Sequence, residues 1–388
     1  MAARDRERLQ FGFDRSPRSK LRIGYLSADL HEHATAYLMA ELFELHDRNR
    51  FEIVAYSYGP DDATPMRTRL KGGFDSFVNV AALPHADAAA RIHDDRIDIL
   101  VDLKGYTTDS RPEIVALRPA AIQVSYIGYP GTMGAEFIDY AVVDYFLAPP
   151  GADAHYTEKL VRLPGSYQVN DRKRVVASTP ARSDLGLPEG AFVFCCFNQA
   201  YKILPRVFEI WTRLVAAVPG SVLWLLDPGA TAARNLRSEL GRRGIDPERL
   251  IVAPKLPLAR HLGRLRAADL FLDTFPYNAH TTTSDALWVG LPVLTCKGDT
   301  FASRVAGSLL SAAGMTELIT SSLEAYEACA LRLARNTPEL IALREKLSRG
   351  RDTAPLFDTP LFARHLEAAY LRMWEIYLRG EPPRAIDV

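Results

Sequence analysis

The sequence has no excess of charge of either sign and no long apolar run. Its 388 residues include 47 lysines and arginines and 47 aspartates and glutamates, so the net charge indicates neither a nucleic acid nor an acidic membrane as a partner. No apolar run reaches the roughly 18 residues that suggest a membrane span, and the charged start MAARDRERLQFGFDRSPRSK is unlike a signal peptide. We therefore expect a cytoplasmic protein without a membrane span.

Cysteine is scarce and shows no recognisable spacing. The four cysteines, Cys195, Cys196, Cys296 and Cys329, form neither a CxxC pair nor the pattern of a disulfide framework. Two of them lie within an apolar run. We expect all four to be buried and reduced, and we expect no structural metal.

The first part of the chain alternates apolar runs with amphipathic segments. Strands are predicted at LRIGYLS (21–27), FEIVAYSY (51–58) and IDILVDL (97–103), with helices at about 35–47 and 85–95 between them. Continuous apolar strands of this kind predict a parallel sheet covered on both faces. The pattern continues to about residue 165 through AAIQVSYIG (120–128) and IDYAVVD (138–144).

A second set of strands follows a passage rich in proline, glycine and charge at 164–190. Its runs are AFVFCCFN, SVLWLLD, RLIVAP, ADLFLDT and LPVLTC. Two such sets predict an α/β protein with two Rossmann-like lobes facing a cleft, because ligands bind at the carboxyl ends of the strands in such sheets. The expected divisions are an N-terminal extension (1–20), an N-terminal lobe (21–170), a C-terminal lobe (171–345) and a helical tail (346–388) whose stripe YLRMWEIYL packs on the core.

One polar loop stands between two apolar runs, in LDTFPYNAHTTTSDALWVGLPVLT (272–295). We expect a Thr or Ser to cap the helix that follows, with free backbone N–H groups at its start forming an anion site suited to phosphate. His280 can donate to a phosphate oxygen, whereas Asp285 should turn towards a neutral donor such as a sugar hydroxyl. The alternative is that the hydroxyls only cap the helix and Asp285 only offsets its dipole.

A second polar segment, FNQAYKILP (197–205), follows the apolar strand FVFCC. This position places Asn198, Gln199 and Lys202 at the carboxyl end of a strand, facing the predicted cleft. A lysine there can stabilise a departing diphosphate. The alternative is an ordinary solvated surface lysine.

A third polar segment, YLSADLHEHATAYLMAEL (25–42), joins the first strand to the first helix. Asp29, His31 and His33 are candidates for acid/base chemistry, and Thr35 is a candidate helix cap. Two histidines at positions i and i+2 do not face each other on a helix, so the segment does not predict a metal site.

Two further regions are weaker candidates. The glycines of GYTTDSRPE (105–113) and SYIGYPGTMGAEFIDY (125–140) let the backbone approach a ligand closely, although G-Y-P-G is also an ordinary turn. In LARHLGRLRAADLF, Arg260, His261 and Arg264 could serve a nucleotide or form a solvated basic helix face.

Taken together, the motifs resemble the catalytic region of the protein O-linked N-acetylglucosamine transferases in their bacterial form, the O-GlcNAc transferase or SPINDLY-type family. The resemblance covers about residues 20 to 380. It implies the GT-B fold, an UDP-N-acetylglucosamine donor, no cofactor or metal, and inverting transfer to Ser or Thr of a polypeptide. The motifs that carry it are RIGYLSADL-x-x-H, VDLKGYT, IQVSYIGYPGTMG, FNQAYKI, SVLWLL, FLDTFPYNAHTTTSDALWVGLPVLT, G-x-x-FASRVAGSLL and APLFDTPLFARHLEAAYLRMWE.

The resemblance also implies a site residue by residue. For the donor it implies the loop residues Asn278, His280, Thr281, Thr282 and Asp285, with the aspartate on the ribose or sugar; Gln199 and Lys202 on the diphosphate; and His261 and Arg264 beside the uridine. On the N-terminal lobe it implies Asp29, His33 and Thr35 near the acceptor and the α-phosphate, and Gly128 and Pro130 beside the N-acetylglucosamine.

The implied reaction is a direct displacement at C1 of the sugar. Lys202, His280 and the helix N-terminus would stabilise the departing UDP, and the proton would pass to His33, to Asp29, to a donor phosphate oxygen or to a water chain. The family lysine near uracil is Leu258 here, so uracil recognition should rest more on backbone groups. The family's tetratricopeptide repeats and linking helical segment are expected from a missing N-terminal part or from a partner.

Three alternatives remain at this point. One is a related transferase that moves another sugar, such as glucose onto Asn. A second is a UDP-N-acetylglucosamine 2-epimerase, against which the pairing of FNQAYK with HTTTSDAL argues. A third is a catalytically inactive protein that binds a UDP-sugar as a sensor or scaffold.

Overall fold

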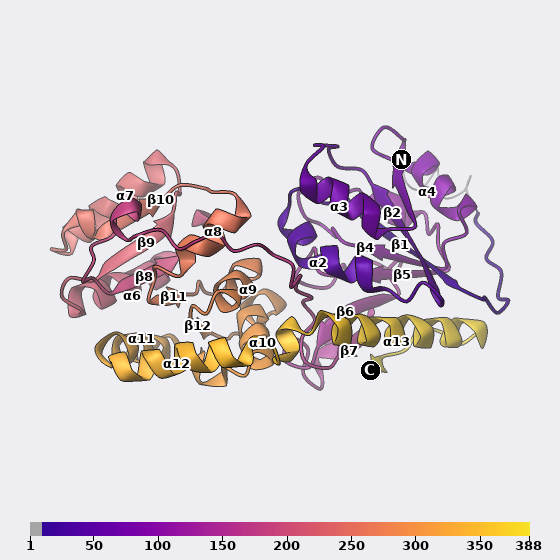
Figure 1. The fold of residues 1–388 in the computed structure, drawn as a ribbon. Helices are drawn as coiled ribbons and strands as arrows, with labels where there is room; N and C mark the ends of the chain where they lie inside the picture. Colours follow the sequence, from indigo (N-terminus) through magenta and orange to yellow (C-terminus); the bar gives the residue numbers. More distant parts are fainter. Residues whose placement is uncertain (1–9) are drawn as a thin grey trace. The chain divides into compact units, whose positions relative to one another are not determined.

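The structure is a computed structural model that describes residues 10–388 and divides into two compact units. Unit 1 comprises the residues up to Lys173 together with Pro355–Val388, and unit 2 comprises Arg174–Ala354. Each unit is built on one parallel sheet with helices (Figure 1), which confirms the predicted α/β class. Residues 1–9 of the expected N-terminal extension lie outside the described residues.

The sheet of unit 1 has the strand order β14-β7-β6-β5-β4-β1-β2-β3, and its neighbouring strands pair in parallel. The predicted apolar runs form its central strands. The edge strands are short or half-exposed, so the sequence pattern did not mark them. The strands are β1 (Leu21–Ser27), β2 (Phe51–Ser57), β3 (Ser76–Asn79), β4 (Ile99–Asp102), β5 (Ile122–Ser125), β6 (Tyr140–Asp144), β7 (Lys159–Leu163) and β14 (Ile386–Asp387).

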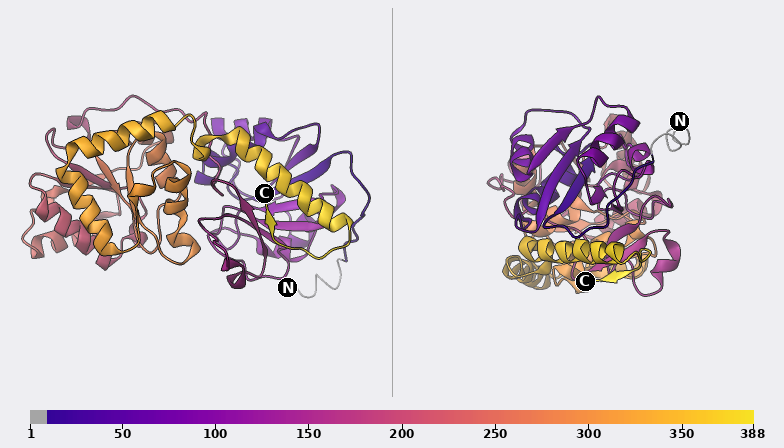
Figure 2. Two further views of the ribbon diagram at one scale, coloured as in Figure 1. Left: turned by 90° about the horizontal axis from the view of Figure 1, so that it is seen from below. Right: turned by 90° about the vertical axis from the view of Figure 1, so that its right-hand side faces the viewer.

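The helix α13 (Thr359–Leu378) belongs to unit 1, where it contacts α2, β5 and β7 (Figure 2). Tyr370 and Trp374 are buried, which confirms that the aromatic stripe packs on the core. The other helices of unit 1 are α2 (Ala34–Leu45), α3 (Pro65–Gly73), α4 (His85–Asp94) and α5 (Pro112–Ala116), with 3-10 turns η1 (Ala152–His155) and η7 (Pro355–Phe357). Within residues 10–388 no helix is both long enough and apolar enough to span a bilayer.

The sheet of unit 2 has the order β10-β9-β8-β11-β12-β13, again with parallel pairing. All four cysteines are in this unit, buried and free as predicted. The strands are β8 (Val193–Cys196), β9 (Val222–Leu226), β10 (Leu250–Ala253), β11 (Leu270–Leu272), β12 (Val293–Cys296) and β13 (Ile319–Thr320). The helices are α6 (Pro205–Ala217), α7 (Ala230–Arg242), α8 (Leu258–Leu265), α9 (Thr281–Trp288), α10 (Val305–Ala312), α11 (Leu323–Arg335) and α12 (Thr337–Gly350), with 3-10 turns η2 (Ser183–Leu185), η3 (Ala200–Lys202), η4 (Pro247–Arg249), η5 (Phe301–Ser303) and η6 (Thr316–Leu318).

Each sheet reverses its strand order once, between β1 and β4 in unit 1 and between β8 and β11 in unit 2. At such a switch point the connections leave in opposite directions, and the loops at the carboxyl ends part to leave a crevice for ligands. Asp29 and Lys104 follow the two strands in unit 1, and Asn198 and Asp273 follow them in unit 2. The topology therefore places one candidate site in each unit.

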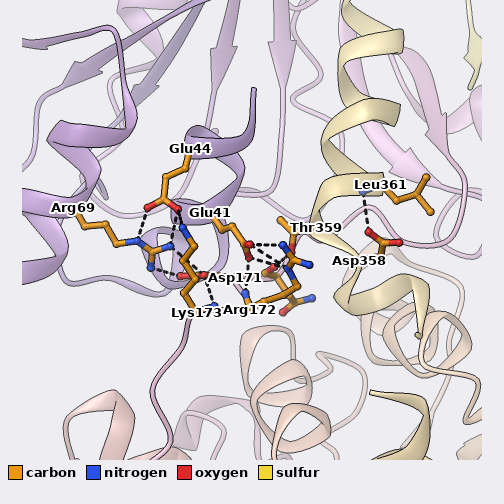
Figure 3. A network of polar contacts seen from close by, with 10 residues as sticks. Glu41, Glu44, Arg69, Asp171, Arg172, Lys173, Asp358, Thr359 and Leu361 are labelled. Carbon is orange, nitrogen blue, oxygen red and sulfur yellow. Dashed lines mark hydrogen bonds and ion pairs between the residues drawn. The ribbon is translucent and has the colours of Figure 1, made fainter. Parts of the chain in front are cut away.

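The chain leaves unit 1 a few residues later than the expected boundary at 170, because polar contacts hold these residues on that unit (Figure 3). The Arg172 guanidinium pairs with Glu41 of α2 at 2.6 Å, and Asp171 pairs with Arg69 of α3. The returning segment is fixed beside them, since the Thr359 hydroxyl donates to the Asn170 carbonyl at 2.5 Å. The expected helical tail is consequently divided, with α12 in unit 2 and α13 in unit 1.

A buried polar chain joins α13 to the rest of unit 1. His46, which ends α2, contacts the Tyr25 hydroxyl through Nε2 at 2.9 Å and the Glu367 carboxylate through Nδ1 at 3.0 Å. The Tyr25 hydroxyl lies 3.0 Å from that of Tyr370, and the Asp47 N–H donates to Glu367 at 2.8 Å. Burial lowers the pKa of His46, so the ring is held neutral.

We predict that Glu367→Ala destabilises unit 1. The substitution leaves the buried His46 ring and the Asp47 N–H without their acceptor, and an unmade buried hydrogen bond costs about 1–3 kcal/mol. Urea unfolding measures the loss. Glu375→Ala, on the exposed face of the same helix, is the matched control and should change the unfolding free energy by less than about 0.5 kcal/mol; equal effects of the two substitutions would contradict the prediction.

Candidate functional site

A single buried carboxylate organises the polar loop of unit 2. Asp273 directly follows β11, and its Oδ1 accepts hydrogen bonds from the backbone N–H groups of Thr274 at 2.7 Å and Ala279 at 2.6 Å. Its Oδ2 accepts from the Thr295 hydroxyl of β12 at 2.6 Å. Burial raises the pKa of Asp273 to about 7, and these hydrogen bonds oppose the rise. The sequence analysis did not single out Asp273, although an acidic residue directly after an apolar strand indicates a position at the carboxyl end of the sheet.

Two amide side chains connect the same loop to its neighbours. Asn198, after β8, donates to the Thr274 hydroxyl at 2.8 Å and accepts from the Thr282 hydroxyl at 2.6 Å. Asn278 is fully buried and donates to the Thr274 carbonyl at 2.9 Å. Asn198 and Asn278 thus shape the loop, and the Thr282 hydroxyl is already used as a donor within it.

The start of α9 differs from the expectation that a Thr or Ser caps it. His280 occupies the N-cap position and makes no side-chain capping bond. The Thr283 and Ser284 hydroxyls do not cap the helix either, because they donate to the Ala279 and Thr281 carbonyls. The backbone N–H groups of Thr281 and Thr282 have no acceptor among residues 10–388. The helix therefore presents open donors, as an anion site requires.

Lys202 is not the solvated surface lysine of the alternative interpretation. Its ammonium donates to the Asn278 carbonyl at 2.9 Å and lies 3.8 Å from the centre of the Tyr277 ring. Burial lowers the pKa of Lys202 to about 8. Burial, with the nearby Lys202 charge, also lowers the pKa of His280 to about 3, so His280 is neutral at pH 7. Gln199, by contrast, is exposed and makes no side-chain bond within the described chain.

Helix α8 carries the second group of basic residues. Its Arg264 side chain is buried and does not belong to a solvated helix face. Its guanidinium lies 4.7 Å from the Phe197 ring centre and donates to Nδ1 of His261 at 2.9 Å. Burial, followed by the Arg264 charge, lowers the pKa of His261 to about 4. A neutral ring that accepts at Nδ1 carries its proton on Nε2, so His261 has one donor left for a ligand. Arg260 alone is exposed, as on a solvated face.

Asp285 has a charged partner that the sequence reading did not foresee. It lies in the second turn of α9. The alternative role of offsetting the helix dipole requires an acidic residue in the first turn, because the effect falls off beyond it. Its Oδ1 accepts from Nη1 of Arg174 at 2.7 Å, and both side chains are buried. Burial raises the pKa of Asp285 to about 6, and the Arg174 charge opposes the rise.

The candidate site of unit 1 spans the switch point between β1 and β4. Asp29 forms a buried ion pair with Lys104, whose ammonium is 2.9 and 3.0 Å from the two carboxylate oxygens. Thr35 does not cap α2 as expected: His33 is the N-cap, and its Nδ1 accepts from the Thr35 N–H at 3.2 Å. His33 Nδ1 also lies 3.4 Å from Asp29. The structure thus brings Asp29, His33 and Thr35 together and adds Lys104.

Neighbouring backbone requires the glycine at position 128 of the glycine-rich loop. A Cβ on Gly128 would lie 2.1 Å from the Leu103 carbonyl oxygen, so only glycine fits this close approach to the backbone before Lys104. Pro130 is half-buried beside it. His31 turns aside towards Asp62, at 3.6 Å. Among residues 10–388 no three His, Cys, Asp or Glu side chains are grouped so as to hold a metal.

The sequence matches Glycosyl transferase family 41 over residues 3–179 and 175–366. The chain belongs to this family. This family-41 chain is 41% identical over 376 residues to the Arabidopsis thaliana protein named "Probable UDP-N-acetylglucosamine–peptide N-acetylglucosaminyltransferase SEC", a match that covers 95% of this chain and 38% of that protein. It is 29% identical over 476 residues to the Caenorhabditis elegans UDP-N-acetylglucosamine–peptide N-acetylglucosaminyltransferase, covering 94% of this chain and 41% of that protein.

A solved structure agrees with the fold of this family-41 chain. It is that of a mutant O-GlcNAc transferase from Thermobaculum terrenum, with a TM-score of 0.89 and 35% sequence identity over 96% of this chain and 71% of that one. The likeness confirms both the predicted resemblance and the GT-B fold. The chain spans about two fifths of the length of the curated relatives it matches.

We predict that Asp273→Asn destabilises unit 2 and loosens the loop between β11 and α9. An amide cannot accept hydrogen bonds on both sides, so at least one buried donor loses its acceptor, at a cost of about 1–3 kcal/mol. Urea unfolding measures the cost. The control is Asp299→Asn, an exposed aspartate in the same unit without a side-chain partner among the described residues; an equally large loss there would contradict the assigned role of Asp273.

Proposed function

We propose that this chain is the catalytic region of an enzyme that transfers N-acetylglucosamine from UDP-N-acetylglucosamine to Ser or Thr hydroxyls of proteins, with inversion at C1. The observation that carries the proposal is the half-buried Lys202 ammonium on the Asn278 carbonyl, in the loop that leads to the open N-terminus of α9. A cation bonded to the loop and unpaired N–H groups at its end suit a diphosphate leaving group. The names of the relatives support the choice of donor and acceptor.

In unit 2 we assign the donor contacts by chemistry. Lys202, the neutral His280 ring and the N–H groups of Thr281 and Thr282 take the diphosphate, with Gln199 beside them. The Nε2–H of His261, fixed by Arg264, donates to the uridine. Asp285 accepts from a hydroxyl of the ribose or the sugar, and Asn278 holds the loop in shape.

In unit 1 we assign the acceptor-side chemistry to the group around Asp29. The acceptor hydroxyl attacks C1 as the C1–O bond to UDP breaks, and its proton passes to a base. The Asp29 carboxylate is occupied by Lys104, and the His33 ring, 43% exposed, accepts from the Thr35 N–H at Nδ1 and so carries its proton on Nε2; we therefore assign the proton to a donor phosphate oxygen or a water chain beside His33. Asp29 and Thr35 then position His33, and the Gly128–Pro130 loop walls the sugar. Tetratricopeptide-type repeats of a longer chain or of a partner would select the acceptor protein.

The decisive experiment combines binding with transfer. Calorimetric titration with UDP and UDP-N-acetylglucosamine is run beside a radiolabelled-sugar transfer assay on a protein lysate, with a panel of UDP-sugars. Binding together with label on Ser or Thr supports the proposal. Label from another sugar or on Asn indicates a related transferase, conversion of the free donor indicates an epimerase, and binding without any reaction indicates a sensor or an inactive protein.

We predict that Lys202→Ala lowers kcat by about 10²–10³-fold, the usual effect of removing one preorganised charge stabiliser from a transition state. Steady-state transfer assays measure it. Lys346→Ala removes a surface lysine of the same unit, paired with Glu317 on the exterior, and should retain full activity. A Lys202→Ala enzyme within about twofold of the parent would refute the leaving-group role.

We predict that the affinity for UDP falls as the pH rises above about 8. The pKa of Lys202 is lowered to about 8, so its ammonium is present below that pH and is lost above it, and with it the attraction for the diphosphate. A guanidinium stays charged to far higher pH. Titrations from pH 7.5 to 10 should therefore show a steeper loss for the parent than for Lys202→Arg; parallel profiles would contradict the prediction.

A further inference from the structure

We propose that Arg174, the first residue of unit 2, is a positioning residue for the donor. It holds one oxygen of the Asp285 carboxylate so that the other oxygen accepts a hydrogen bond from a hydroxyl group of the nucleotide sugar. The inference rests on the proposed function, because it assumes that a nucleotide sugar binds at α9. It adds a residue that lies more than a hundred positions away in the sequence and that no motif of the polar loop contains.

The two oxygens of Asp285 have different surroundings. Oδ1 accepts from Arg174 Nη1 at 2.7 Å. Oδ2 accepts no hydrogen bond from residues 10–388. It is not fully enclosed by protein atoms either, because the enclosed side-chain atoms without a partner do not include it. It therefore remains accessible to a ligand. Asp285 also lies four residues after Thr281, on the same face of α9 as the open N-terminal turn.

The position of Arg174 within unit 2 is fixed by an aromatic contact as well as by Asp285. Its guanidinium lies 5.2 Å from the ring centre of Trp288, one turn after Asp285 on the same helix. The residues just before it are bonded within unit 1, where the Arg172 N–H donates to Glu41 at 2.7 Å and the Lys173 N–H donates to Asp171 at 2.8 Å (Figure 3). The side chain of Arg174 is 1% exposed. Such a guanidinium orients a carboxylate far better than a mobile surface residue does.

Charge gives the second argument for the pair. A buried carboxylate without a cation becomes protonated near neutral pH. Burial already raises the pKa of Asp285 to about 6 against the opposing effect of Arg174. Removal of Arg174 would raise this pKa further, so the carboxylate would lose its charge, and its strength as an acceptor, in the neutral range. Arg174 therefore acts on both the direction and the charge of Asp285.

The test compares Arg174→Gln with the parent by calorimetric titration against UDP, 2′-deoxy-UDP and UDP-N-acetylglucosamine. If Asp285 accepts from the ribose, the parent prefers UDP to 2′-deoxy-UDP by about tenfold or more, as expected for a hydrogen bond to a charged group, and the variant loses this preference. If it accepts from the sugar, the loss lies in the preference for UDP-N-acetylglucosamine over UDP. A variant that keeps every preference within about twofold overturns the inference.

The pH profile separates positioning from a merely structural effect. For Arg174→Gln the lost affinity should return as the pH rises, with a midpoint above that of the parent, because the unpaired Asp285 ionises later. In an Asp285→Asn background, Arg174→Gln should add nothing further. A pH-independent loss, or an additive loss in the double variant, would mean that Arg174 acts only through the linker, and either result overturns the inference.

Arg351 offers a matched control. Its guanidinium lies 5.3 Å from the same Trp288 ring but makes no bond to Asp285, so Arg351→Gln should leave the affinities unchanged, and an equal loss would overturn the inference. Should Arg174→Gln fail to fold, Asp285→Asn alone must abolish the hydroxyl preference, and its persistence would overturn the inference. A parent that binds none of the three ligands contradicts the proposed function instead.

Discussion

The candidate donor site depends on one buried carboxylate, that of Asp273. Burial of a charge is unfavourable unless hydrogen bonds satisfy it. Here the required donors come from the backbone on both sides of the loop and from the neighbouring strand β12. The need to satisfy this group forces the loop after β11 to curl back, and the curl presents the Asn278 carbonyl to Lys202. The arrangement of the polar loop of unit 2 follows from that single requirement.

Burial also sets the charge of the surrounding groups. It holds the imidazoles of His280 and His261 neutral and leaves Lys202 within reach of deprotonation near neutral pH. A cluster of basic residues therefore carries much less positive charge than its composition suggests. Under the proposed function, such a site attracts a diphosphate chiefly through N–H donors and one ammonium whose charge depends on pH, without a permanent excess of positive charge.

The sequence predicted the strand and helix order well, because apolar runs report burial directly. It also marked polar segments at both switch points: YLSADLHEH follows β1 in unit 1, and FNQAYK and HTTTSDAL follow β8 and β11 in unit 2. It missed contacts between distant positions. The partners Lys104 of Asp29 and Arg174 of Asp285 are 75 and 111 residues away, and no local pattern encodes such a pair. The requirement for glycine at position 128 likewise comes from backbone distant in the sequence, at Leu103. The predicted cap of α2 was wrong for a local reason, because His33, two residues before Thr35, accepts from the Thr35 N–H.

The chain completes unit 1 only after it has passed through the whole of unit 2, because α13 and β14 come last in the sequence. Unit 2, in contrast, is one uninterrupted segment. During synthesis from the N-terminus the second unit has all its strands before the first has its final helix. Until α13 emerges, the surface of α2 and the ends of the Tyr25–His46 polar chain face water. The connectivity therefore lets the C-terminal unit complete its fold during synthesis before the N-terminal unit can complete its own.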